Sequence, residues 1–223
     1  PDTRTAMEGL YVAGEDAGGA HGSNRLGGNG VANSTVYGGV AGDVMGADIR
    51  NMGALRDPDE AVLEAEVARA LRPLSNRIAP IQPLRDKLQE AMWEDVGVMR
   101  TETGMRRGQA RIADIQAELM ETGISGDNLA FNLTWHDWLN MASLCEISEV
   151  ITEAGLAREN SRGAHFREDF PESGSMESSY FTVARQTGAE LGVSREDVKF
   201  TIVRPGETIL PEGEPISLVE AAE

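Results

Sequence analysis

Apolar residues recur at intervals of three and four from Asp57 to about Arg158, the spacing that places side chains on one face of an α-helix. This pattern predicts four helices. The first is expected to begin at an N-cap Asp57, with Pro58 in its first turn and Glu60 completing a capping box. Its apolar, inward face is predicted to consist of Leu63, Val67, Ala70, Leu71 and Leu74.

The other three helices follow from the same spacing. One should follow Pro83, with Leu84, Leu88, Ala91 and Met92 inward. The next runs from about Gly104 to Glu121 on Ile112, Ile115 and Leu119. The last starts at a cap, Thr134, and is apolar almost all round, so it should be the central and most buried helix. Together they predict a helical bundle.

The chain begins with a different pattern. The run GLYVAG (residues 9–14) is short, apolar and bounded by glycines, which predicts a buried strand. A glycine-rich loop leads to Gly30, and helical spacing then resumes through Val31, Val36 and Val40. Strand, glycine loop and helix in this order are typical of a cofactor-facing turn in an α/β sheet.

The tail alternates apolar and polar residues as strands do. The segments SSYFTVARQ (178–186) and VKFTIVRPG (198–206) are predicted to pair as a small antiparallel sheet. After Pro211 the chain is acidic and is expected to fray. The pattern as a whole predicts a mainly α fold with three parts, residues 1–50, 57–160 and 161–223.

Charge narrows the classes of partner. The 223 residues carry a net charge of -17, which disfavours binding to nucleic acids and to anionic membranes because both would repel the chain. No run of 18 apolar residues occurs, so no membrane-spanning helix is predicted.

A single cysteine, Cys145, cannot form an internal disulfide and is expected to be a buried apolar residue. With three scattered histidines, no metal site is predicted.

Two charged residues of the glycine-rich region are candidates for chemistry. Glu15 ends the predicted strand, where its carboxylate could accept two hydrogen bonds from a ribose or ribityl diol; the alternative is a surface acid. Arg25 could hold a carboxylate or phosphate with its planar guanidinium; the alternative is an ion pair with Glu15 or Asp16. The segment SRGAHFREDF (161–170) is either a catalytic cluster or, as we expect, a polar loop that fixes the bundle to a neighbouring domain through ion pairs.

The motifs GLYVAGEDAGGAHGSNRLGGN (9–29) and SRGAHFREDFP (161–171), with VGVMRTETGM (96–105) between them, resemble the C-terminal third of the succinate dehydrogenase and fumarate reductase flavoprotein family, which includes L-aspartate oxidase. The resemblance implies that residues 1–50 are the last piece of an FAD-binding α/β domain. It further implies that residues 57–160 are the family's helical domain, and that the chain is cut from a longer protein.

The family pattern also assigns roles to single residues. It implies that Glu15 binds the FAD ribose, that Arg25 binds a carboxylate of a dicarboxylate substrate, and that the backbone N–H groups of Gly30 and Val31 bind the pyrimidine edge of the flavin. The family has Ser and Leu where this chain has Gly30 and Val31, which leaves main-chain contacts possible. No catalytic residue is assigned.

The leading hypothesis is an FAD-dependent enzyme that interconverts succinate and fumarate by hydride transfer and passes electrons to an iron-sulfur subunit. The resemblance implies a cytoplasmic location, either free or peripheral on the cytoplasmic face of the inner membrane. One alternative is an L-aspartate oxidase-like or other dicarboxylate oxidoreductase. The other is a helical assembly module that is inactive in isolation.

Overall fold

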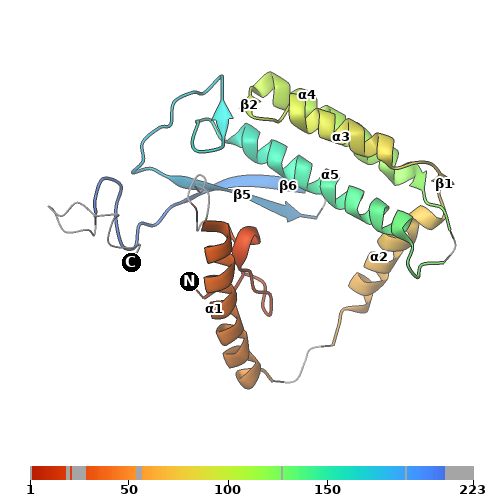
Figure 1. Cartoon of the computed structure of the whole chain (residues 1–223), viewed down its shortest axis with the longest axis horizontal. Helices are drawn as coiled ribbons and strands as arrows, with labels where there is room; N and C mark the ends of the chain where they lie inside the picture. The colour runs from red at the N-terminus through yellow and green to blue at the C-terminus, as the bar shows by residue number, and fades with distance from the viewer. Residues whose placement is uncertain are drawn as a thin grey trace, which may run out of the picture.

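Three helices form the core of the protein. The computed structural model of the chain describes residues 2–18, 21, 29–53, 57–126, 128–188 and 190–208. Helices α3 (Gln82–Glu94), α4 (Glu102–Glu121) and α5 (Leu133–Ala157) pack side by side (Figure 1). Their shared core contains Leu84, Leu88, Ile112, Ile115, Leu119, Trp138, Met141 and Cys145. The predicted inward faces of α3 and α4, and the burial of Cys145, are therefore confirmed.

Two N-caps lie two residues from their predicted positions. The N-cap of α5 is Asn132, whose Oδ1 accepts from the Trp135 N–H at 3.0 Å, and not Thr134. Helix α2 (Glu60–Leu71) is capped by Asp59, which accepts from the N–H groups of Ala61 and Val62, and not by Asp57. In both cases several cap-forming side chains lie close together in sequence, and loop geometry decides which one reaches a free N–H.

Helix α2 does not bury its apolar face. Leu63 is 47% exposed and Val67 is 56% exposed, so the predicted inward face is wrong. The C-terminal end of the helix is attached to the bundle by the Trp135 indole, whose Nε1 donates to the carbonyl of Ala70 at 2.7 Å. The spacing of apolar residues identifies a face of a helix but not whether a partner covers it. A 3-10 turn, η2 (Arg72–Leu74), follows α2.

Helix α5 is also less enclosed than its sequence predicts. Trp138, Met141 and Cys145 are fully buried, while Leu144 and Ile147 on the same helix remain exposed. The helix is central to the bundle, as expected, because it contacts α4, α3 and both strands of the C-terminal hairpin. It is not buried on every side.

Short parallel pairings connect distant loops. Strand β1 (Arg77–Ile78) pairs with β3 (Thr122–Gly123), and β2 (Met99–Arg100) pairs with β4 (Phe166–Arg167). Two-residue strands leave no alternation in the sequence, so they were not predicted. At Gly123 a Cβ atom would collide with the carbonyl of Asn76, so this close approach requires glycine.

The C-terminal sheet is a hairpin of β5 (Tyr180–Thr187) and β6 (Glu190–Asp197), joined at Gly188 with φ of +63°. The first strand was predicted, but the second is ELGVSRED and not VKFTIVRPG. A tight turn at Gly188, where positive φ favours glycine, returns the chain at once. The polar character of β6 hid it from a search for apolar alternation.

The N-terminal region contains a 3-10 turn, η1 (Gly14–Asp16), and helix α1 (Asn29–Asn51), which lies apart from α3–α5 in Figure 1. The helix was predicted, but the strand at residues 9–14 was not found. Within the described chain the only strand-type pairing of Tyr11 is an isolated antiparallel bridge with Arg4. A buried strand needs hydrogen-bonded neighbours along its length, and the segment around Arg4 supplies only one position of pairing.

None of the described helices is long and apolar enough to cross a lipid bilayer.

Candidate functional site

Three of the four predicted site residues lie where η1 meets the start of α1. Glu15 is exposed on η1, and Gly30 and Val31 belong to the first turn of α1. Arg25 lies outside the described residues, so both its predicted role and the alternative ion pair with Glu15 or Asp16 stay predictions. The structure therefore brings the segment of Glu15 to the helix end that carries Gly30 and Val31.

Glycine makes this approach possible. Gly14 is buried and adopts a φ of +86°, a conformation that side chains rarely tolerate. A Cβ atom at this position would lie 3.0 Å from Ser34 Oγ of α1. The Nδ2 of the buried Asn33 donates to the carbonyl of Gly14 at 3.1 Å and fixes the two segments together. A larger residue at position 14 would therefore strain the backbone and crowd Ser34 where η1 meets α1.

The start of α1 offers hydrogen-bond donors. In any α-helix the first four N–H groups have no partner within the helix, and here these include the N–H groups of Gly30 and Val31. The first turn of α1 carries no acidic side chain, so the positive end of the helix dipole is not neutralised by its own residues. Because these donors belong to the main chain, they do not depend on which residue types occupy positions 30 and 31.

Acceptors lie beside these donors. The Oδ1 of Asn33 is buried and has no hydrogen-bond partner among the described residues, and the Nδ2 of the same amide lies 3.1 Å from His21 Nε2. A buried amide oxygen without a partner costs free energy unless a donor reaches it. With the Glu15 carboxylate, the site presents both acceptors and main-chain donors. This combination fits the hydroxyl groups and the heterocyclic edge of a dinucleotide such as FAD.

Ion pairs and hydrogen bonds fix the loop of residues 161–170 to the helical bundle, as expected for a polar loop. The buried Arg167 forms a two-pronged ion pair with Asp169, with Nε to Oδ1 at 2.7 Å and Nη2 to Oδ2 at 2.8 Å. Its Nη1 donates to the carbonyls of Gly155, Leu156 and Arg158 at the end of α5. The predicted ion pairing is confirmed, but it fixes the loop to the bundle itself.

Asp169 joins this loop to a second helix. Its Oδ2 accepts from the Glu102 N–H at the start of α4 at 2.7 Å. The Arg167 guanidinium and this N–H lower the pKa of Asp169 to about 2. The loop therefore holds the C-terminal end of α5 next to the N-terminal end of α4.

His165 is neutral in this arrangement. Its Nδ1 accepts from Arg100 Nη1 at 2.8 Å and its Nε2 donates to the Arg158 carbonyl at 3.2 Å. Burial is the main cause that lowers the pKa of His165, and the positive charges of Arg100, Arg158 and Arg167 lower it further. An imidazole that accepts from a guanidinium cannot carry a second proton, so geometry and charge agree.

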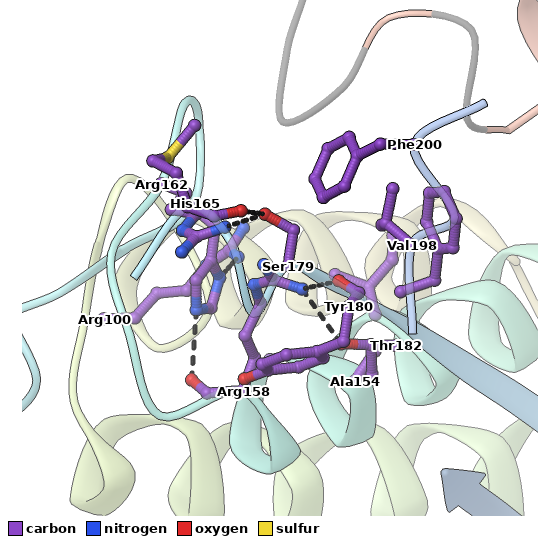
Figure 2. Close-up of a pocket in the computed structure, with 14 residues that line it drawn as sticks. Arg100, Ala154, Arg158, Arg162, His165, Ser179, Tyr180, Thr182, Val198 and Phe200 are labelled. Atoms are coloured by element: carbon purple, nitrogen blue, oxygen red, sulfur yellow. Dashed lines mark hydrogen bonds between the residues drawn. The ribbon is translucent and has the colours of Figure 1, made fainter. Parts of the chain in front are cut away.

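A cavity that the sequence did not predict lies beside this loop. It has a volume of about 550 Å³ and is lined by residues of α5, the loop, β5 and the segment after β6 (Figure 2). Arg100 reaches the cavity from β2 and Arg158 reaches it from the end of α5. These positions are 58 residues apart in sequence, so no local motif marks the cavity.

Within the described residues, no group of three or more His, Cys, Asp or Glu could hold a metal ion.

Comparison with known proteins gives two family matches. A model described as "Fumarate reductase flavoprotein C-term" matches residues 85–210, and one described as "FAD binding domain" matches residues 1–31. The second match contains Glu15, Arg25, Gly30 and Val31.

Known proteins are similar in sequence and structure to most of this chain. The fumarate reductase (CoM/CoB) of Methanothermobacter marburgensis has a subunit that is 34% identical over 170 residues, 76% of this chain and 30% of that protein. L-aspartate oxidase 1 of Ralstonia nicotianae is 33% identical over 172 residues, with the same coverages. The structure of Mycobacterium smegmatis Sdh1 in complex with UQ1 superposes with a TM-score of 0.80 at 29% identity, over 88% of this chain and 33% of that one. The chain thus spans about a third of the length of these proteins.

Proposed function

Because this chain belongs to the fumarate reductase and succinate dehydrogenase flavoprotein family, we propose that it forms the C-terminal part of an FAD-dependent oxidoreductase that interconverts succinate and fumarate. The observation that supports this most directly is the junction of η1 and α1. There Gly14 and Asn33 hold the Glu15 segment against the helix end that carries Gly30 and Val31. These residues lie within or next to the match to the FAD-binding model, which covers residues 1–31.

In this proposal each residue has a separate task. The N–H groups of Gly30 and Val31 bind the pyrimidine edge of the flavin, and the Glu15 carboxylate accepts from ribose hydroxyls. Bound FAD would supply the centre that exchanges a hydride with the dicarboxylate. Arg25 holds one carboxylate of the substrate, which fixes its orientation and stabilises charge that develops during the reaction. The further assignment of residues 1–50 to a cofactor domain and 57–160 to a helical domain is part of the same proposal.

Substitution of Arg25 tests the proposal. A bidentate guanidinium-carboxylate contact in a site poor in water contributes about 2 to 4 kcal/mol. Both Arg25→Ala and Arg25→Lys should therefore lower turnover of succinate and fumarate by roughly a hundredfold, since lysine keeps the charge but loses the planar fork. Steady-state rates and the flavin absorbance spectrum are measured with the protein expressed from its complete native gene.

Arg50→Ala is the matched control, because Arg50 is an exposed arginine in the last turn of α1. Its turnover should equal that of the unchanged protein, and all three variants should retain flavin. Near-normal turnover in Arg25→Ala would show that Arg25 is only an ion-pair partner, and the substrate role proposed for it would be abandoned.

The relative from Ralstonia nicotianae supports a second candidate, an L-aspartate oxidase-like activity. The two candidates share FAD and a dicarboxylate substrate and differ in the group on the substrate carbon. Rates with L-aspartate compared with succinate and fumarate separate them. A purified protein that is colourless and shows no turnover with any of the three would favour the third possibility, an inert helical assembly module.

The fumarate reductase relative from Methanothermobacter marburgensis is a subunit, which supports association with other chains. We propose that the electrons pass to an iron-sulfur subunit. We further propose that the assembly is cytoplasmic and attached at the cytoplasmic face of the inner membrane. Co-purification of a partner with iron-sulfur absorbance from membrane fractions tests both parts. Recovery of the flavoprotein alone in the soluble fraction would contradict them.

A further inference from the structure

The cavity beside the 161–170 loop has one positive wall and one apolar wall. Figure 2 shows Arg100 and Arg162, next to the neutral His165, on one side and Val198 and Phe200 on the other. Arg158, Ser179 and Tyr180 lie between the two sides. Its volume of about 550 Å³ lies in the range of small-molecule sites. None of the described residues that line it is among the proposed flavin contacts.

The positive wall has no acidic counterpart. Arg100, Arg158 and Arg162 line the cavity, and within the described chain none of them forms an ion pair with a carboxylate. None of the described lining residues is Asp or Glu. This concentration of positive charge occurs in a chain with a net charge of -17, in which most other arginines of the bundle do pair with acids.

Two guanidinium groups retain unused donors. Arg158 uses Nε on Asn160 Oδ1, and its Nη1 donates to the Tyr180 carbonyl and to Thr182 Oγ1. Arg100 uses Nε on the carbonyls of Val96 and Gly97, and Nη1 on His165. In each case Nη2 makes no hydrogen bond to the described residues, although a guanidinium has five N–H donors. Both groups therefore have donors left for a ligand.

The guanidinium of Arg158 is held in place before any ligand arrives. It stacks on the Tyr180 ring at 4.7 Å, and Arg195 stacks on the same ring at 4.8 Å. Burial is the main cause that lowers the pKa of Arg158 and of Arg100, which means that their charges are partly deprived of water. A bound anion would restore that lost solvation. Because the Arg158 guanidinium is already held in place, its binding to an anion would cost little conformational entropy.

The opposite wall is suited to an apolar group. Phe200 and Phe181 line the cavity and remain 38% and 42% exposed, and Ile151 and Val198 line it as well. Exposed aromatic side chains next to a charged wall bind ligands that have both an apolar body and a charged end.

We propose that this cavity binds a small organic anion, with its carboxylate or phosphate group on Arg100 and Arg158 and its apolar body against Phe200 and Val198. Arg162 adds positive charge at the rim while its own N–H groups organise the loop through Ser173, Ser175 and Ser179. This site is additional to the flavin and dicarboxylate contacts proposed above and does not depend on them.

Calorimetric titration of the 223-residue chain with four probes tests the site: phenyl phosphate, phenylacetate, inorganic phosphate and benzyl alcohol. Phenyl phosphate or phenylacetate should bind at least tenfold more tightly than both inorganic phosphate and benzyl alcohol, and added salt should weaken this binding. Whichever of the two binds more tightly identifies the anionic group. Equal affinity for the charged probes and benzyl alcohol would overturn the proposal.

Two variants probe the two walls separately. Arg158→Gln should weaken the charged aromatic probe at least tenfold, and Arg185→Gln is its control, because Arg185 lies on β5, is exposed and pairs with Glu196. Since Arg158 also holds β5, Phe200→Ala provides an independent test. It should remove the preference for phenyl phosphate over inorganic phosphate while inorganic phosphate binds as before. An unchanged preference in Phe200→Ala, or equal weakening by Arg185→Gln, would refute the site.

Discussion

At the scale of single residues, burial decides the chemistry of the one thiol. Cys145 is fully buried in the core between α3, α4 and α5. Burial raises the pKa of its thiol to about 11, with a further contribution from Glu146. The thiolate is the reactive form, so the buried thiol is both inaccessible and protonated at neutral pH.

We expect Cys145 to react with a thiol reagent such as DTNB only when the protein unfolds. At pH 8 the rate constant for the folded protein should be at least roughly a thousandfold below that in 6 M guanidinium chloride, as expected for a core thiol exposed only by rare opening. Both rates are measured from the absorbance of the thiolate that the reagent releases. Comparable rates in the two conditions would show that the helices around Cys145 open readily.

At the scale of elements, a single arginine joins two helix ends. The last turn of α5 contains no basic residue of its own, and Arg167 supplies the donors for its free carbonyls from the following loop. Asp169 then links the same group to the N-terminus of α4. The charges match the helix dipoles at both ends, positive at the end of α5 and negative at the start of α4.

The lowered pKa of Asp169 predicts how stability depends on pH. Because the folded-state pKa lies below that of the unfolded chain, the stabilisation is complete above about pH 4 and is lost as pH falls toward 2. Asp169→Asn should lower the free energy of unfolding by about 1 to 2 kcal/mol at pH 7, allowing for partial exposure of the carboxylate. At pH 3 the destabilisation caused by Asp169→Asn should be roughly half of its value at pH 7.

Urea unfolding of both proteins at pH 7 and pH 3 measures that difference, with Asp114→Asn as the control. Asp114 is an exposed acid of α4 with no ion pair among the described residues. Its substitution should change the unfolding free energy by less than about 0.5 kcal/mol at either pH. A destabilisation by Asp169→Asn that is the same at pH 7 and pH 3 would contradict the assigned ion pair.

At the scale of the whole molecule, burial is unevenly distributed. Helices α3, α4 and α5 share one core, whereas α2 buries no residue and α1 buries only Asn33 and Ala41. Apolar side chains such as Val31, Val36 and Ile49 on α1 are exposed. Apolar burial is the main stabilising contribution, so the two parts should differ strongly in local stability.

Hydrogen exchange should reveal this difference. Amides in the middle of α4 and α5 should exchange at least roughly a hundredfold more slowly than amides in the middle of α1 and α2, because opening the latter exposes little buried surface. Exchange measured by mass spectrometry on the 223-residue chain separates these segments. Protection of α1 equal to that of α5 would mean that α1 is covered by a partner, such as a second copy of the chain.

The sequence by itself determined the features that repeat over several turns of helix. The spacing of Leu84 and Leu88, and of Ile112 and Ile115, fixed α3, α4 and their inward faces, because a period of three to four residues is a local property. The quoted motifs likewise identified the family. Arg25 and the tail beyond residue 208 stay predictions, because they lie outside the described residues.

Tertiary structure alone decided which apolar faces are covered and which distant side chains meet. Nothing local distinguishes Leu63, which stays exposed, from Leu88, which is buried, because burial depends on what lies opposite. The same reason explains the absent strand at residues 9–14, whose pairing depends on other segments, and the assembly of Arg100, Arg158 and His165 around one cavity. Contacts between residues far apart in sequence leave no pattern in either segment, so only the folded chain could show them.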